Sequence, residues 1–157
     1  MAPQLLFDIC GLDFDKVQYG VEQIEQRNPH RGAMRMLDGV VYVQENFHTC
    51  VAYKDIRTDA FWVPGHIPGR PLFPGVLMIE AAAQLASFVT MLRYPDIKFM
   101  GFVKVDAVKF RGQVEPGDRL VILAKMVEFR RRRSICDAQA LVNGTVVFEG
   151  RITGMPM

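Results

Sequence analysis

Apolar and polar positions alternate over much of the chain and predict strands. Residues 36–43 and 48–56 are rich in apolar and β-branched side chains and favour a hairpin. After Lys98 the pattern predicts further strands at residues 103–110, 120–129, 135–142 and 146–152, with the tight-turn sequence Asn143-Gly144 before the last one. We therefore expect an antiparallel sheet of about five or six strands.

The last two predicted strands have one polar and one apolar face. Polar residues at positions 137, 139, 149 and 151 alternate with apolar residues at positions 136, 138, 140, 148 and 152. This alternation is typical of a sheet that is packed on one face and solvated on the other.

Residues 76–92 form the long helix candidate. They are rich in Ala, Leu and Met, Pro74 suits the first turn, and Pro95 ends the segment. Because nearly the whole circumference is apolar, we expect this helix to be buried on most sides. Helical spacing places the polar exceptions on one narrow stripe: Glu80, Gln84 and Ser87. One long helix and a sheet, with a short helix at residues 21–26, predict an α+β domain.

The composition favours one domain with more apolar surface than a small monomer can hide. The chain has 157 residues, of which 50% are apolar, and a mean hydropathy of +0.09. Charged residues make up 23% and the net charge is +2, which argues against a disordered chain and against a nucleic-acid binder that works by bulk charge. Residues 76–92 fall short of the ~20 residues of a membrane-spanning helix and contain Glu80, so we expect no membrane span.

Cysteine usage and the N-terminus indicate a cytoplasmic protein. The three cysteines, Cys10, Cys50 and Cys136, give an odd number and form no Cys-x-x-Cys pair. A disulfide framework or a zinc site is therefore not expected, and a reducing compartment is the default. The first residues lack the basic start and long apolar core of a signal peptide.

His66 and Glu80 are the candidates for chemistry. Seven of the twelve residues 64–75 are Pro or Gly, which predicts a stiff, shaped loop around His66. An imidazole exchanges protons near neutral pH, and apolar surroundings favour the protonated form of a carboxyl group such as that of Glu80. Such a pair can remove one proton and deliver another. The free N–H groups at Gly75 and Val76, where the helix starts, could hold a carbonyl oxygen that gains negative charge.

Each candidate also has a structural alternative. A single loop histidine is usually structural or exposed, and a buried Glu80 can be satisfied by a neighbour such as Gln84. His30 lies at the boundary of a predicted secondary-structure element, so a structural role is favoured for it. We assign no function to His48. Because His66 and Glu80 stand on either side of one rigid loop, the functional interpretation is favoured for this pair.

The stretch from Gly65 to Gln84 resembles the signature of one enzyme family. It reads Gly-His-x-Pro-Gly-x-Pro-x-x-Pro-Gly-Val-Leu-x-x-Glu-Ala-x-Ala-Gln. This is similar to the signature of the (3R)-hydroxyacyl-[acyl-carrier-protein] dehydratases of type II fatty acid synthesis, which have the hot-dog fold. The resemblance extends over residues 28–154 and includes Pro29-His30-Arg31, residues 108–111 and 114–118, and the basic run at 130–133.

The resemblance implies a role for each candidate residue. His66 would take the C2 proton of a (3R)-3-hydroxyacyl thioester, and Glu80 would assist departure of the 3-hydroxyl group as water. Backbone at Gly75 and Val76 would hold the thioester carbonyl, and no metal or organic cofactor is implied. Glu80 in place of an aspartate favours a simple dehydratase over the relative that also isomerises the double bond.

The resemblance also implies partners and a domain organisation. The substrate would arrive on an acyl carrier protein, and the enzyme would be a homodimer with shared active sites, often assembled as a trimer of dimers. Residues 130–133 would either dock the acidic carrier or form a solvated strand end. Neither nucleic acid nor a membrane is expected as a partner. Residues 28–157 would form the hot-dog dehydratase domain, after an N-terminal leader with a short helix at residues 1–27.

Departures from the family pattern leave some questions open. Residues 32–35 replace a Tyr-Pro-Phe-Leu-type segment, Gly39 stands where an arginine is common, and Ile67 replaces a phenylalanine. None of these departures changes His66 or Glu80 themselves. They leave open the acyl chain length of the substrate, the group that carries the substrate and the metabolic pathway. Two other functions also stay open: a hot-dog acyl thioesterase and a non-catalytic hot-dog protein that binds acyl thioesters.

Overall fold

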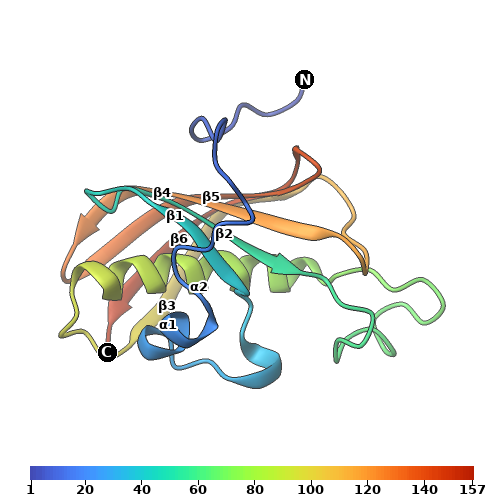
Figure 1. Ribbon diagram of the computed structural model, residues 1–157, viewed down its shortest axis with the longest axis horizontal. Coiled ribbons are helices and arrows are strands. Elements are labelled where there is room, and N and C mark those ends of the chain that lie inside the picture. Colours follow the sequence, from blue (N-terminus) through green and yellow to red (C-terminus); the bar gives the residue numbers. More distant parts are fainter.

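A six-stranded antiparallel sheet wraps around one long helix in the computed structural model, which describes all 157 residues (Figure 1). The strands lie in the order β1-β2-β4-β5-β6-β3, and every neighbouring pair is antiparallel. This arrangement is the hot-dog fold, so the predicted α+β class is confirmed. The strand bounds are β1 Gly39–Val43, β2 Thr49–Asp55, β3 Met100–Phe110, β4 Arg119–Arg130, β5 Arg133–Val142 and β6 Thr145–Pro156.

Helix α2, Gly75–Arg93, lies against one face of the sheet (Figure 1). The shorter helix α1, Val21–Arg27, packs on the side of α2 that faces away from the sheet. A 3₁₀ turn at Gly32–Met34 follows α1. Helix α2 starts one residue earlier than the sequence predicts, and Pro74 takes the capping position before the first turn.

Burial of α2 explains its apolar composition. Ten of its 19 residues are buried, and most of them belong to the main hydrophobic core. By length and hydropathy, with a mean of 1.6 over 18 residues, α2 is long and apolar enough to cross a membrane, so the expectation that this segment is too short was wrong. However, 61% of that window is buried inside the fold, which makes α2 its core helix.

The N-terminal residues cover the outer face of the sheet, opposite α2 (Figure 1). The backbone N–H of Leu6 donates to Gln139 Oε1 at 3.0 Å, and Gln139 Nε2 donates to the carbonyl of Gln4 at 3.0 Å. A small cluster of buried residues lies on this face of the sheet: Val51, Leu123, Leu141 and Val146. Six apolar side chains of the N-terminal segment pack on this cluster: Leu5, Leu6, Phe7, Ile9, Leu12 and Phe14. The face predicted to be solvated is therefore covered at Gln139, which is only 3% exposed.

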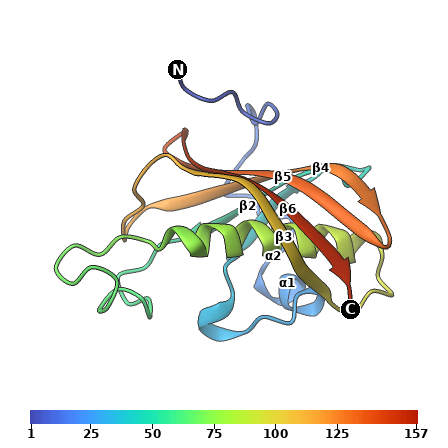
Figure 2. The ribbon, with the colours of Figure 1, turned by 180° about the vertical axis from the view of Figure 1, so that it is seen from behind.

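The two edges of the sheet differ. The edge strand β1 is covered by a bridge between Tyr19 and Val40. On the other side, β3 pairs with β6 along one edge, and its outer edge has no neighbour (Figure 2). Phe102, Val103 and Phe110 on this strand are 49–52% exposed. A long, apolar, unpaired edge strand is a ready template for pairing with another chain.

Candidate active site

The loop that carries His66 is anchored to the core. The backbone N–H of His66 donates to the carbonyl of Trp62 at 2.7 Å, and that of Phe73 donates to the carbonyl of Val114 at 2.7 Å. The rings of Trp62 and Phe73 pack edge to face, with their centroids 5.5 Å apart. Both ends of the loop are thereby held, as its proline and glycine content predicts.

The imidazole of His66 is oriented by one short hydrogen bond. Its Nδ1 lies 2.6 Å from the carbonyl oxygen of Leu72. Because a carbonyl oxygen can only accept, Nδ1 carries the hydrogen and Nε2 of the neutral ring is free to take a proton. The next residue, Ile67, has a φ of 60°, a left-handed conformation that costs a β-branched residue energy. The loop thus holds His66 in the tautomer that a general base requires.

The start of α2 offers two unused backbone donors. The N–H groups of Gly75 and Val76 have no backbone acceptor, as expected for the first residues of a helix. The ring of Phe110 lies directly over Gly75, since a Cβ at that position would be 2.9 Å from the ring. These N–H groups point to a place where an oxygen with negative charge can bind.

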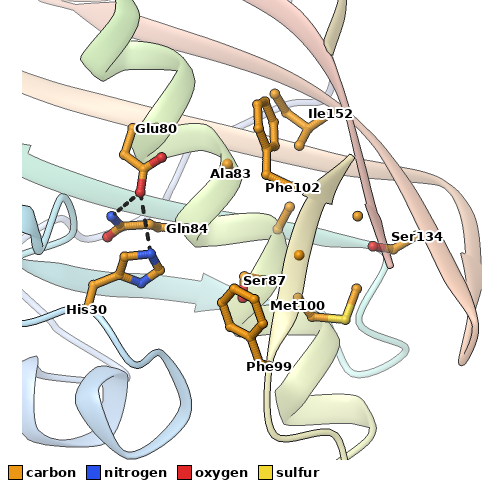
Figure 3. Close-up of a pocket in the computed structure, with 13 residues that line it drawn as sticks. His30, Glu80, Ala83, Gln84, Ser87, Phe99, Met100, Phe102, Ser134 and Ile152 are labelled. Atoms are coloured by element: carbon orange, nitrogen blue, oxygen red, sulfur yellow. Dashed lines mark hydrogen bonds and ion pairs between the residues drawn. The ribbon is translucent and has the colours of Figure 1, made fainter. Parts of the chain in front are cut away.

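Glu80 lies further along α2, at a separate cavity of about 90 Å³ (Figure 3). The predicted polar stripe faces this cavity, because Glu80, Gln84 and Ser87 all line it. The other lining residues come from the 28–31 region, α2 and strands β3, β5 and β6 or their flanks: His30, Ala83, Ala86, Phe99, Met100, Gly101, Phe102, Ser134, Ile152 and Gly154. The carboxyl group of Glu80 therefore faces a cavity that is lined mostly by small and apolar residues.

One oxygen of Glu80 contacts two nitrogen atoms. Gln84 Nε2 donates to Glu80 Oε1 at 2.7 Å, and His30 Nε2 lies 3.4 Å from the same oxygen (Figure 3). The buried amide of Gln84 is itself fixed, because its Oε1 accepts from the N–H of Met36 at 2.8 Å and its Nε2 also donates to the carbonyl of Met34 at 2.7 Å. The structural alternative considered for Glu80, satisfaction by Gln84, is thus a real contact.

Within one chain the two candidate residues do not meet. No hydrogen bond or ion pair joins His66 and Glu80, and His66 does not line the cavity at Glu80. The structure instead brings His30 to Glu80, a neighbour that the sequence interpretation missed. No periodicity connects positions so far apart, and the only sign was the match of Pro29-His30-Arg31 to the family pattern.

The two buried cysteines, Cys50 and Cys136, are not reactive thiolates. Cys50 and Cys136 are fully buried, and burial raises the pKa of the Cys136 thiol to about 12 and that of Cys50 well above its usual value. Both thiols therefore stay protonated at neutral pH, as expected for small core residues.

Substitution of Gln84 tests how much of the local structure depends on it. Gln84→Leu keeps the volume but leaves the Met36 N–H and the Met34 carbonyl unpaired in the interior. We expect a loss of about 2–4 kcal/mol in the free energy of unfolding, measured by urea denaturation. The control Gln113→Leu changes an exposed glutamine and should cost less than about 0.5 kcal/mol. Equal stability of the two variants would contradict this assignment.

Comparison with known proteins identifies the family. Residues 28–151 match the model of the FabA-like domain. Proteins named 3-hydroxyacyl-[acyl-carrier-protein] dehydratase FabZ are similar: that of Herpetosiphon aurantiacus is 36% identical over 132 residues, 83% of this chain and 92% of the relative. That of Streptococcus pneumoniae is 37% identical over 135 residues, 85% of this chain and 94% of the relative. That of Helicobacter pylori is 36% identical over 145 residues, 88% and 91% of the two chains.

Solved structures share the fold. A chain of the dehydratase heterocomplex ApeI:P from Xenorhabdus doucetiae superposes with a TM-score of 0.74 at 18% identity, over 85% of this chain and 90% of that one. A hypothetical thioesterase with coenzyme A from Streptococcus pneumoniae gives a TM-score of 0.57 at 12% identity, over 75% and 84% of the two chains. These identities support the fold alone, but the family model and the relatives at 36–37% identity go further: the chain belongs to the FabA-like family.

Proposed function

We propose that this protein is a hydro-lyase that removes water from (3R)-3-hydroxyacyl thioesters in fatty acid biosynthesis or a related pathway. The product would be the trans-2-enoyl thioester. The observation that carries the proposal is the presence of two complementary groups: an imidazole with a free Nε2 at His66 and a carboxyl group at Glu80 that lines a largely apolar cavity. The names of the similar proteins support the same reaction.

The working site lies between two copies of the chain in this proposal. His66 and Glu80 are apart in one chain, so His66 of the partner subunit would complete the site at Glu80. The unpaired outer edge of β3 supports this arrangement, as do the exposed apolar side chains of Phe99 and Phe102 beside the Glu80 cavity. Three such dimers would form the trimer of dimers that the family resemblance implies.

The reaction follows from these positions. Nε2 of His66 takes the C2 proton, and the electron pair moves toward the thioester carbonyl, whose oxygen is held by the N–H groups of Gly75 and Val76. The C3–O bond then breaks, and protonated Glu80 gives its proton to the departing hydroxyl group. Water leaves, a C2=C3 double bond remains, and a proton passes from the His66 imidazolium to the Glu80 carboxylate through solvent. The scheme needs no metal or organic cofactor.

An acyl carrier protein is the proposed carrier of the substrate, and arginines at the β4–β5 turn its docking point. Two arginines of this turn have acidic partners: Arg131 pairs with Asp96 and Arg133 pairs with Glu128. Arg130 and Arg132 form no ion pair within the chain. Their charges are therefore available for an acidic partner protein.

Location and domain organisation complete the proposal. A cytoplasmic location fits three cysteines that are all free thiols. We assign the dehydratase domain to residues 28–157, since the family match begins at residue 28, and treat residues 1–27 as an added leader with the short helix α1.

Replacement of either candidate group should abolish most of the activity. His66→Ala and Glu80→Gln are each expected to slow hydration of a trans-2-enoyl thioester by about 10²–10⁴-fold, because each removes one proton-transfer group. The rate is followed by loss of enoyl absorbance. His48→Ala and Glu45→Gln, at exposed positions outside the site, are matched controls that should keep the wild-type rate.

The same assay separates the other candidate functions. Near-normal turnover by folded His66→Ala protein would overturn the mechanism. Release of free thiol without hydration would indicate a thioesterase, since only hydrolysis liberates the thiol. Tight binding of an enoyl thioester by the wild-type protein with no turnover would indicate a non-catalytic binding protein.

Charge reversal tests carrier docking. The double variant Arg130→Glu, Arg132→Glu should raise KM for a carrier-linked substrate by about tenfold at low salt, with a smaller effect at high salt. A short thioester mimic without the carrier should be turned over at the wild-type KM. The control reverses two exposed charges elsewhere, Lys16→Glu and Arg57→Glu, and should leave both values unchanged. An equal loss on both substrates in the arginine variant would contradict docking at this turn.

A further inference from the structure

We propose that His30 is a positioning residue that, together with Gln84, holds Oε1 of Glu80 and so makes Oε2 the oxygen that exchanges a proton with the substrate. The proposal rests on the proposed function, in which Glu80 is the acid. It goes beyond that function because it assigns a residue outside the His66–Glu80 pair and distinguishes the two oxygens of one carboxyl group.

The two oxygens of Glu80 have different surroundings. Oε1 accepts a hydrogen bond from Gln84 Nε2 at 2.7 Å, and His30 Nε2 lies 3.4 Å from the same oxygen. Oε2 has no hydrogen-bond partner in the chain, and Figure 3 shows both dashed lines meeting at one oxygen while the other is free. Because the amide of Gln84 is fixed by Met34 and Met36, it cannot turn its oxygen toward the carboxyl group. Oε1 is thus the anchored atom.

The surroundings of His30 determine which nitrogen carries the hydrogen. Nδ1 is buried and has no partner, whereas Nε2 faces Oε1 of Glu80. A hydrogen on Nδ1 would be a buried donor without an acceptor, and it would leave a lone pair of Nε2 against a carboxylate oxygen. The neutral form with hydrogen on Nε2 avoids both costs. His30 therefore presents an N–H group toward Oε1 of Glu80 across 3.4 Å.

The backbone at His30 is tied to α2, so the ring cannot drift away from Glu80. Asn28, which is 2% exposed, donates from Nδ2 to the carbonyl of Gln84 at 2.9 Å. Arg31 Nη1 donates to the carbonyls of Asn28 at 2.8 Å and His30 at 2.9 Å. These contacts hold the segment 28–31 against the helix turn that carries Gln84.

Two donors on one oxygen suit an acid that must lose its proton. A hydrogen bond to a carboxylate is stronger than one to a neutral carboxyl group, so the contacts of His30 and Gln84 strengthen as the proton leaves Oε2. Of the residues that line the cavity, only His30 and Glu80 carry ionisable side chains. The negative charge that develops on the Glu80 carboxyl group therefore faces the N–H groups of Gln84 and His30.

Two isosteric amides test the role. In His30→Gln the amide nitrogen reaches the place of Nε2, whereas in His30→Asn it reaches only that of Nδ1. We expect His30→Gln to keep kcat for enoyl thioester hydration within about threefold of wild type. We expect His30→Asn to lower kcat by about ten- to a hundredfold with KM within about threefold, because alignment for proton transfer is lost and substrate binding is kept. Melting temperatures report the fold of each variant.

A double-variant cycle separates positioning from general stability. In the background of Glu80→Gln, His30→Asn should lower the residual rate by less than about twofold, because its effect passes through the carboxyl group. Equal loss of kcat in the two amide variants, a full additive loss in the Glu80→Gln background, or wild-type kcat in His30→Asn would each overturn the role of His30. A wild-type protein that hydrates no enoyl thioester would instead overturn the proposed function, and the role with it.

Discussion

A helix that is apolar around nearly its whole circumference must be covered on most sides, and this requirement organises the molecule. The sheet covers one side of α2, and α1 with residues 28–36 covers part of the other. The buried amide of Gln84 ties the 28–36 segment to α2, since it bonds Met34, Met36 and Glu80 at once. The outer edge of β3 and the exposed rings of Phe99 and Phe102 have no cover in one chain, and in the proposed structure a second copy covers them.

The same helix positions two of the proposed catalytic features, the backbone N–H groups at its start and the carboxyl group of Glu80. Its first turn offers the N–H groups of Gly75 and Val76, and about one and a half turns later it presents Glu80 to the cavity. A rigid helix thus fixes the spacing between the site for the carbonyl and the acid. The base, His66, sits on a loop that is itself anchored at both ends. Such preorganisation lets the groups act without rearrangement during the reaction.

The regular elements were predictable because their cause is local. Alternation and helix-forming composition predicted about five or six strands and two helices, with bounds within about four residues of those observed. The role of Gln139 was not predictable, because it depends on an N-terminal segment without periodicity that crosses the sheet from afar. The surroundings of position 39 are likewise visible only in space: a Cβ there would lie 2.6 Å from the ring of Tyr53, so a larger residue would require that ring to move.

The candidate site shows the same division. The loop at His66 and the polar stripe at Glu80 and Gln84 follow from composition and helical spacing. The contact between His30 and Glu80 does not, since it joins two distant parts of the chain through tertiary packing. That His66 and Glu80 stay apart in one chain is likewise a property of the fold and not of their spacing.

The central claim, that one site uses His66 of one subunit and Glu80 of the other, is tested most directly by mixed dimers. His66→Ala and Glu80→Gln chains with different affinity tags are co-expressed, and the species carrying both tags is purified. Each mixed dimer then holds one site with both native groups, so we expect about half of the wild-type hydration rate from two chains that are each inactive alone. A mixed dimer no more active than its parents would contradict the account.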